Sequence, residues 1–221
     1  MMKILFMCGY YSDAAHETAE RTSEYWDAYR FCRAVRSGAF EEKFYIHTQK
    51  DKILVNENNI DLARRAFGKF IEKRIAEETS WPSPVLVPMP SEDAVIGVNH
   101  FRSWFMLNEA LAQTELRLSP VDALFWKKTP RPGVLDAAAA ERKALAGMMT
   151  CDFPLRGQAV VLVDDLVSTG TTLLAARDCL TAEGAAVLGA VTCGRVIHDF
   201  HALPFGRQET WLEDGVTNTD A

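Results

Sequence analysis

The feature that most constrains this 221-residue chain is an apolar run, Ala159–Val163, that leads directly into two aspartates. A continuous apolar segment rich in β-branched residues is typical of a strand that is covered on both faces. Asp164 and Asp165 follow it, and a short loop then leads to a helix that is predicted to begin at Thr171. A buried strand that passes through a tight loop into a helix is the repeating unit of layered α/β folds.

Apolar periodicity elsewhere in the chain predicts further strands and helices in alternation. We therefore expect an α/β fold with a mostly parallel central sheet flanked by helices. The predicted strands are Lys3–Cys8, Phe44–His47, Lys52–Val55, Val85–Pro88, Ala123–Trp126, Ala159–Val163 and Ala186–Cys193. The predicted helices are residues 13–36, 59–78 with a cap at Asn58 or Asn59, 99–114, 137–149 and 171–183, and the tail from His198 onward is predicted to be irregular.

Length and composition indicate a single domain over residues 1–221. With 48% hydrophobic residues the chain can bury a full core, and it contains no repeat, low-complexity tract or clear linker. The net charge of -6 makes a nucleic-acid partner unfavourable, because such a role usually requires a basic surface. The five cysteines form no CxxC pair, and their odd number favours reduced thiols in a cytoplasmic protein. We see no signal segment and no apolar run of the roughly 18 residues that a membrane span requires.

The loop after the two aspartates has the composition of a phosphate-binding site. A helix N-terminus presents unpaired backbone N–H groups and a partial positive charge, and both favour an anion. Gly170 can adopt backbone angles that other residues avoid, and it lets a ligand approach closely. The small hydroxyl side chains around it are Ser168, Thr169, Thr171 and Thr172. We therefore predict that this segment surrounds a phosphate group.

The acidic pair requires a different partner, because two carboxylates repel a bare phosphate. Asp164 and Asp165 are suited to the hydroxyls of a sugar or to a hydrated Mg²⁺. A ligand with a phosphate at one end and a diol beside it satisfies both halves of the segment, and ribose 5-phosphate is the natural candidate. Each half alone is equally compatible with an ordinary capped loop, but both halves at this spacing after a buried strand favour a ligand site.

Residues 160–173 resemble the phosphoribosyl-pyrophosphate signature of type I phosphoribosyltransferases: a hydrophobic strand, two acidic residues and a Thr/Ser-Gly-x-Thr loop. The resemblance implies that Asp164 and Asp165 contact the ribose hydroxyls, act in catalysis and bind Mg²⁺. It also implies that Val167 and the following loop, residues 168–172, bind the 5-phosphate.

Other segments are similar to the ComF-like branch of this family. They are Val85–Pro90 followed by Gly97–Asn99, Lys128–Pro130 and the helix-prone stretch 140–147. The resemblance thus covers about residues 60–195 and leaves residues 1–58 as an N-terminal extension outside the recognisable part. It implies that the substrate site also includes Met89, Pro90 and Ser91, along the pyrophosphate, and the basic residues Lys128 and Arg131.

One loop departs from the family pattern. The segment after Pro90 reads Ser91-Glu92-Asp93, whereas the pyrophosphate loop of the family often offers a basic residue. Two acids beside a pyrophosphate are repulsive unless they face solvent or hold a metal. Positive charge would then have to come from elsewhere, and the candidates are Arg102, Lys127, Lys128 and Arg131.

Two functions remain open. The first is a Mg²⁺-dependent phosphoribosyltransferase that displaces pyrophosphate from phosphoribosyl pyrophosphate with a nitrogenous acceptor such as a nucleobase. The second is a non-catalytic regulator that binds phosphoribosyl pyrophosphate or a ribose 5-phosphate nucleotide, with a ComF-like role in competence as its narrower version. The acidic Glu92-Asp93 pair favours the second function. Both are compatible with a homodimer.

Overall fold

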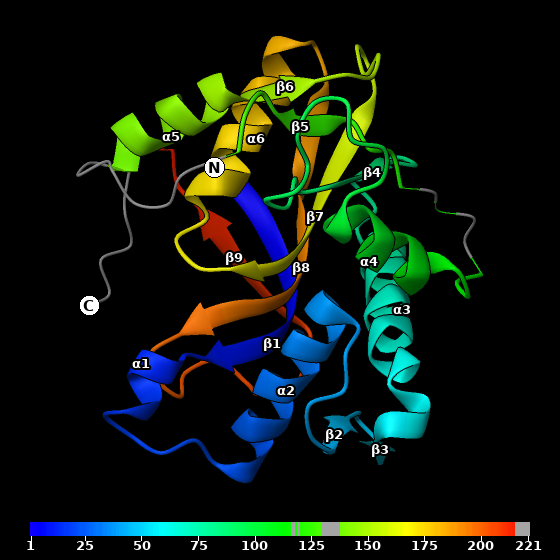
Figure 1. Cartoon of the computed structure of the whole chain (residues 1–221), viewed down its shortest axis with the longest axis vertical. Coiled ribbons are helices and arrows are strands. Elements are labelled where there is room, and N and C mark those ends of the chain that lie inside the picture. Colours follow the sequence, from blue (N-terminus) through cyan, green and yellow to red (C-terminus); the bar gives the residue numbers. More distant parts are fainter. Residues whose placement is uncertain (116–117, 119, 130–137, 215–221) are drawn as a thin grey trace.

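The computed structural model describes residues 1–115, 118, 120–129 and 138–214, and its centre is a five-stranded sheet (Figure 1). The strand order is β4-β7-β8-β1-β9; neighbours from β4 to β1 are parallel, and β9 is antiparallel to β1. The strands are β1 (Met2–Tyr11), β4 (Val85–Pro88), β7 (Ala159–Val167), β8 (Ala186–Ile197) and β9 (Gln208–Leu212). The prediction of an α/β fold with a mostly parallel sheet is confirmed.

The inner strand β7 is covered on both faces. Successive side chains of a strand point to opposite faces of its sheet. Val161 and Val163 accordingly belong to one apolar cluster, and Val160 and Leu162 belong to a second. All four side chains are 0% exposed. The apolar run forms a strand here because two layers of helices remove both of its faces from water.

One face of the sheet is covered by three helices and a small hairpin. Two of these helices approach closely at Gly68, where a Cβ atom would lie only 1.8 Å from the carbonyl oxygen of Ala110. Glycine at this position therefore lets the two helix backbones touch. The elements on this face are α2 (Ser23–Ser37), α3 (Asp61–Glu77), α4 (Arg102–Leu111), and the hairpin of β2 (Phe44–His47) and β3 (Lys52–Val55).

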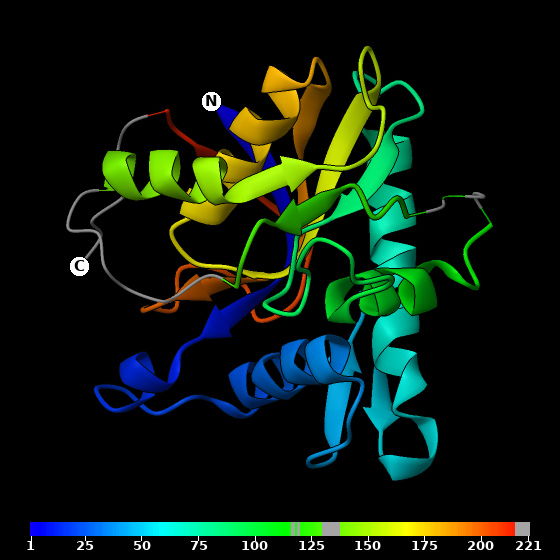
Figure 2. The same ribbon diagram turned by 45° about the horizontal axis from the view of Figure 1, so that its top comes forward.

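The opposite face is covered by two helices and a two-stranded sheet. Figure 2 shows α5 (yellow-green) and α6 (gold) on the side of the sheet away from α3 (cyan). These elements are α5 (Ala138–Met148), α6 (Thr171–Ala182), β5 (Leu124–Trp126) and β6 (Met149–Cys151). None of the helices within the described ranges is long and apolar enough to cross a membrane.

The predicted helix over residues 13–36 is wrong as one element, because it is two helices. A short α1 (Asp13–His16) ends where the His16 ring accepts a hydrogen bond from the backbone N–H of Arg21. The chain then turns, and α2 begins after Thr22 in an extended conformation. The predicted cap of the next helix is also wrong. Asn56 caps a 3₁₀ turn (Glu57–Asn59), and α3 follows that turn directly.

The C-terminal tail is not irregular throughout, because β9 lies within it and pairs with β1 at the edge of the sheet. The strands β7 and β8 also extend past their predicted ends, to Val167 and Ile197. The segment 1–58 contributes β1 to the central sheet, between β8 and β9, and α2 to one of its faces. The assignment of the whole chain to one domain stays a prediction.

Candidate functional site

The acidic pair and the segment Met89–Ser91 lie side by side at the carboxyl edge of the sheet. β4 pairs with β7 in parallel, with Pro88 opposite Val163, and the backbone N–H of Met89 donates to the carbonyl of Val163 at 2.8 Å. β4 ends here at Pro88, whereas β7 continues to Val167, so Met89 follows on beside Asp164 in the register of the two strands. Ligands of open α/β sheets bind outside this edge.

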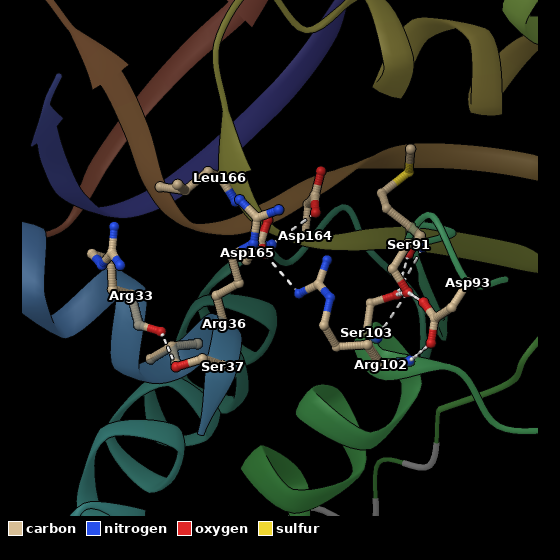
Figure 3. A network of polar contacts seen from close by, with 12 residues as sticks. Arg33, Arg36, Ser37, Ser91, Asp93, Arg102, Ser103, Asp164, Asp165 and Leu166 are labelled. Carbon is tan, nitrogen blue, oxygen red and sulfur yellow. Dashed lines mark hydrogen bonds and ion pairs between the residues drawn. The ribbon is translucent and has the colours of Figure 1, made fainter. Parts of the chain in front are cut away.

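The Asp165 carboxylate lies between two arginines (Figure 3). Its Oδ2 atom is 3.2 Å from Nε of Arg36 on α2 and 3.2 Å from Nη1 of Arg102 on α4. Its Oδ1 atom accepts the backbone N–H of Leu166 at 2.8 Å. The residue is buried at 8% exposure. Two guanidinium groups thus accompany this buried carboxylate and compensate for its removal from water.

Asp164 makes no ion pair with the part of the chain that the structure describes. Its Oδ1 atom accepts the backbone N–H of Asp165 at 2.8 Å. Burial, followed by the charge of Asp165, raises the pKa of Asp164 well above its ordinary value. The site therefore favours anything that brings positive charge or hydroxyl donors to this carboxyl group.

The donor set around Asp164 fits Mg²⁺ only if a ligand completes it. Within residues 1–115, 118, 120–129 and 138–214, no group of three or more His, Cys, Asp or Glu side chains could hold a metal ion. Mg²⁺ is usually bound through one or two carboxylates together with waters and substrate phosphates. Asp164 offers such a carboxylate, and Asp165 adjoins it. These residues match a Mg²⁺ ion that is shared with a phosphorylated ligand.

The predicted phosphate loop leads into the N-terminus of α6. Gly170 is the N-cap residue with φ of +77°, and glycine has no side chain that could cap the helix. The Oγ1 atoms of Thr169 and Thr171 are 2.9 Å apart and share a hydrogen bond, which orders the turn. Ser168, Thr169 and Thr172 are exposed, whereas Thr171 is buried. The loop therefore exposes three hydroxyl side chains at a helix N-terminus, the kind of position at which proteins bind anions.

Two other predicted site residues have more limited roles. The side chain of Val167 is buried in the core at 3% exposure, so only its backbone is available to a ligand. Lys128 is exposed and follows β5. Arg131 lies outside the described residues.

The indole of Trp126 holds the Met89–Ser91 segment in place. Its Nε1–H group donates to the carbonyl oxygens of Pro90 and Ser91, each at 3.1 Å. The backbone of Trp126 also exchanges hydrogen bonds with Ala94 and Ile96, on either side of a short bridge.

The sequence led us to expect that Glu92 and Asp93 repel an anion, but in the structure Asp93 has a different role. Asp93 accepts the Ser91 hydroxyl at 2.5 Å through Oδ1 and the backbone N–H of Arg102 at 2.9 Å through Oδ2. Ser91 Oγ in turn accepts the backbone N–H of Ser103 at 3.2 Å. Partial burial opposes ionisation, but the hydrogen bonds from Ser91 and Arg102 hold the pKa of Asp93 below its usual range. Asp93 therefore caps α4, while Glu92 is exposed.

Three residues of the site were not predicted from the sequence. Arg36 is on a helix outside the recognised segment, Ser103 donates to the Met89 carbonyl at 2.5 Å, and Trp126 was assigned only to a strand. Arg102, in contrast, was among the candidates for restoring positive charge. No local motif marks Arg36 or Ser103, because each acts through a fold contact with a distant segment.

Comparisons with known proteins support the sequence resemblance over part of the chain. Residues 150–199 match the family model of the phosphoribosyl transferase domain, so the resemblance of this segment is confirmed. A search of the curated proteins found no match. The similarity to the ComF-like branch stays a prediction.

Several solved structures are similar to the chain at low identity. Adenine phosphoribosyltransferase from Saccharomyces cerevisiae is 12% identical with a TM-score of 0.41, over 75% of this chain and 88% of that chain. A phosphoribosyltransferase from Corynebacterium diphtheriae is 17% identical with a TM-score of 0.39, over 77% and 83%. Orotate phosphoribosyltransferase from Mycobacterium tuberculosis is 16% identical with a TM-score of 0.39, over 76% and 84%. All three values describe a distant likeness.

Proposed function

We propose that this protein binds phosphoribosyl pyrophosphate and transfers its ribose 5-phosphate group to a nitrogenous acceptor such as a nucleobase. The observation that carries the proposal is the position of Asp164 and Asp165 near the carboxyl end of β7, one short loop before the N-terminus of α6 and inside the segment that matches the phosphoribosyl transferase domain. The carboxylates are suited to the ribose diol, and the exposed hydroxyls and N–H groups of residues 168–172 to the 5-phosphate.

In the proposed reaction, a bond forms between the acceptor nitrogen and C1 of the ribose, and the bond from C1 to the pyrophosphate oxygen breaks. Pyrophosphate leaves with the bonding electrons, and the acceptor loses a proton. The sugar becomes cation-like, so Asp164 and Asp165 orient the diol and lie close to positive charge. Met89–Ser91 and Arg102 lie along the leaving group. A Mg²⁺ ion held by Asp164 and the ligand would supply further positive charge to the pyrophosphate.

A second function, binding without turnover, is favoured by a specific observation. Both arginines nearest the site already contact Asp165, so this carboxylate must exchange partners before a sugar hydroxyl can reach it. A regulator tolerates such competition better than an enzyme does.

All five cysteines are free thiols, which supports a reducing compartment for either function.

Calorimetry with phosphoribosyl pyrophosphate and Mg²⁺ tests ligand binding. Asp165→Asn and Thr172→Val should each weaken binding at least tenfold. Asp178→Asn and Thr181→Val are matched controls: Asp178 is also paired with an arginine, Arg142, but on the far part of α6, and Thr181 lies at the other end of that helix. Wild-type protein that binds neither phosphoribosyl pyrophosphate nor a ribose 5-phosphate nucleotide would exclude both functions.

Pyrophosphate release separates the two functions. The wild-type protein is incubated with phosphoribosyl pyrophosphate, Mg²⁺ and a panel of nucleobases, and released pyrophosphate is measured. Release with at least one base supports the transferase. Tight binding without release over the whole panel would favour the regulator.

A further inference from the structure

The two arginines on Asp165 come from helices that are far apart in the sequence. Arg36 is in the last turn of α2, and Arg102 is the first residue of α4. Both guanidinium groups approach the same carboxylate oxygen, each at 3.2 Å, so they lie close to one another (Figure 3). Arg36 is also outside the segment, residues 150–199, that matches the phosphoribosyl transferase domain.

Arg36 differs from the other arginines of the same helix in its partner. Arg30 pairs with Glu42 and Arg33 pairs with Glu41, and both of these acids are on the following loop. Arg36 has no ion-pair partner other than Asp165 among the residues that the structure describes. α2 therefore directs one of its three arginines to the carboxyl edge of the sheet and satisfies the other two locally.

The charges around Asp165 leave room for an anion. Two guanidinium groups carry two positive charges, while the carboxylate that both of them contact carries one negative charge. The side chains of Arg36 and Arg102 are 50% and 36% exposed, so a ligand can reach them. A guanidinium group is well suited to phosphate oxygens, because its N–H groups form a planar fork.

We propose that Arg36, together with Arg102, binds the diphosphate of the ligand, and that both arginines move from Asp165 to this diphosphate as the ribose binds. The inference rests on the proposed function. A sugar hydroxyl can donate to Asp165 Oδ2 only when this oxygen is released by a guanidinium group. The same ligand supplies the hydroxyl that replaces the arginines and the anion that receives them. α2 thus completes the pyrophosphate subsite from a part of the chain that carries no motif.

The exchange predicts different effects on different parts of the ligand. Calorimetry with Mg²⁺ compares three probes: phosphoribosyl pyrophosphate, inorganic pyrophosphate and ribose 5-phosphate. Arg36→Gln should lower the affinity for the first two at least tenfold and change the affinity for ribose 5-phosphate less than twofold. Arg36→Lys should recover part of the loss, since it keeps the charge without the fork. Arg30→Gln, on the same helix but paired with Glu42, is the matched control and should leave all three affinities unchanged.

The outcomes distinguish this inference from the proposed function. If Arg36→Gln weakens all three probes equally, Arg36 only maintains Asp165, and the inference is wrong. The inference is also wrong if the wild-type protein binds ribose 5-phosphate and the Arg36→Gln variant binds inorganic pyrophosphate with the same affinity as the wild-type protein. If wild type binds none of the probes, the proposed function fails first. Thermal unfolding of each variant identifies a loss of affinity that is caused by misfolding.

Discussion

Asp93 accepts the backbone N–H of Arg102 at 2.9 Å, so an acidic residue of the Met89–Asp93 loop stabilises the first turn of α4. The same residue, Arg102, reaches Asp165 with its side chain. The acidic loop therefore orients a cation toward the site, although its sequence alone suggested repulsion of an anion.

Asp93→Ala should destabilise the protein by about 1 kcal/mol, the usual cost of removing a cap from a helix N-terminus. Asp93→Asn should cost less, because its single amide oxygen can still accept one of the two hydrogen bonds. Urea unfolding at neutral pH measures both. The two hydrogen bonds depress the pKa of Asp93 in the folded state, so its contribution is present above the unfolded value near 3.8 and disappears as the pH falls through the folded value. The difference between wild type and Asp93→Asn should accordingly shrink below about pH 4; a difference that stays constant into acid would contradict the capping role.

Asp164→Asn should stabilise the folded protein at pH 7, whereas Asp93→Ala destabilises it. The pKa of Asp164 is raised in the folded state, mainly by burial and then by Asp165, so the native protein is penalised once this group ionises. The variant should therefore unfold at a higher temperature than wild type at pH 7, and this advantage should shrink as the pH falls through the folded pKa and vanish below the unfolded value near 3.8. Its affinity for phosphoribosyl pyrophosphate should drop at least tenfold, about 1.4 kcal/mol. Scanning calorimetry over pH tests the effect on stability, and a binding titration tests the effect on affinity. A variant that is less stable than wild type at pH 7 would show that burial of this carboxylate carries no penalty.

Gly170→Ala should destabilise the protein more than Gly157→Ala does. Both glycines have positive φ, +77° and +76°, and an alanine there costs about 1 kcal/mol. A Cβ at Gly170 would also lie 2.2 Å from Cδ1 of Leu212, whereas a Cβ at Gly157 meets nothing within 4 Å. We expect an additional cost of about 1 kcal/mol, since Leu212 must shift. In a Leu212→Ala background the extra cost should disappear, and urea unfolding of the four variants measures this. An equal cost for both substitutions with Leu212 present would contradict the expected clash between Leu212 and a Cβ atom at position 170.

Gly68→Ala and Gly147→Ala should move stability in opposite directions. Both glycines are in helices, α3 and α5. A Cβ at Gly68 meets backbone atoms of Ala110, which cannot rotate away, and we expect a loss of about 2–4 kcal/mol. A Cβ at Gly147 meets nothing within 4 Å, so the higher helix propensity of alanine should stabilise by roughly 0.5–1 kcal/mol. Thermal unfolding reports both signs, and a neutral Gly68→Ala would mean that α3 and α4 are separated in solution.

The fold and the central motif could be predicted because their signals are local. β7 and the loop into α6 are continuous in the sequence, so apolar pattern, glycine and hydroxyl residues lie within one short stretch. β9 was not predicted, because at the edge of the sheet its side chains alternate only between half-buried and exposed. Its pairing with β1 also joins segments that are far apart in the sequence. Arg36 escaped for the same physical reason. Its role is set by the packing of α2 beside β7, and neighbouring residues in the sequence carry no trace of that contact.

The place of β1 between β8 and β9 has a consequence for synthesis. During translation, residues 2–11 are made before the other strands of the sheet, but the two strands that pair with them, β8 and β9, are made after the others. The first strand must therefore wait with exposed backbone donors and acceptors and apolar side chains, a state that invites wrong pairing. Sheet closure then depends on contacts of very long sequence separation, which slow folding. The sheet is thus expected to close only after β8 and β9 have been synthesised, and folding is expected to benefit from chaperones that shield β1 until then.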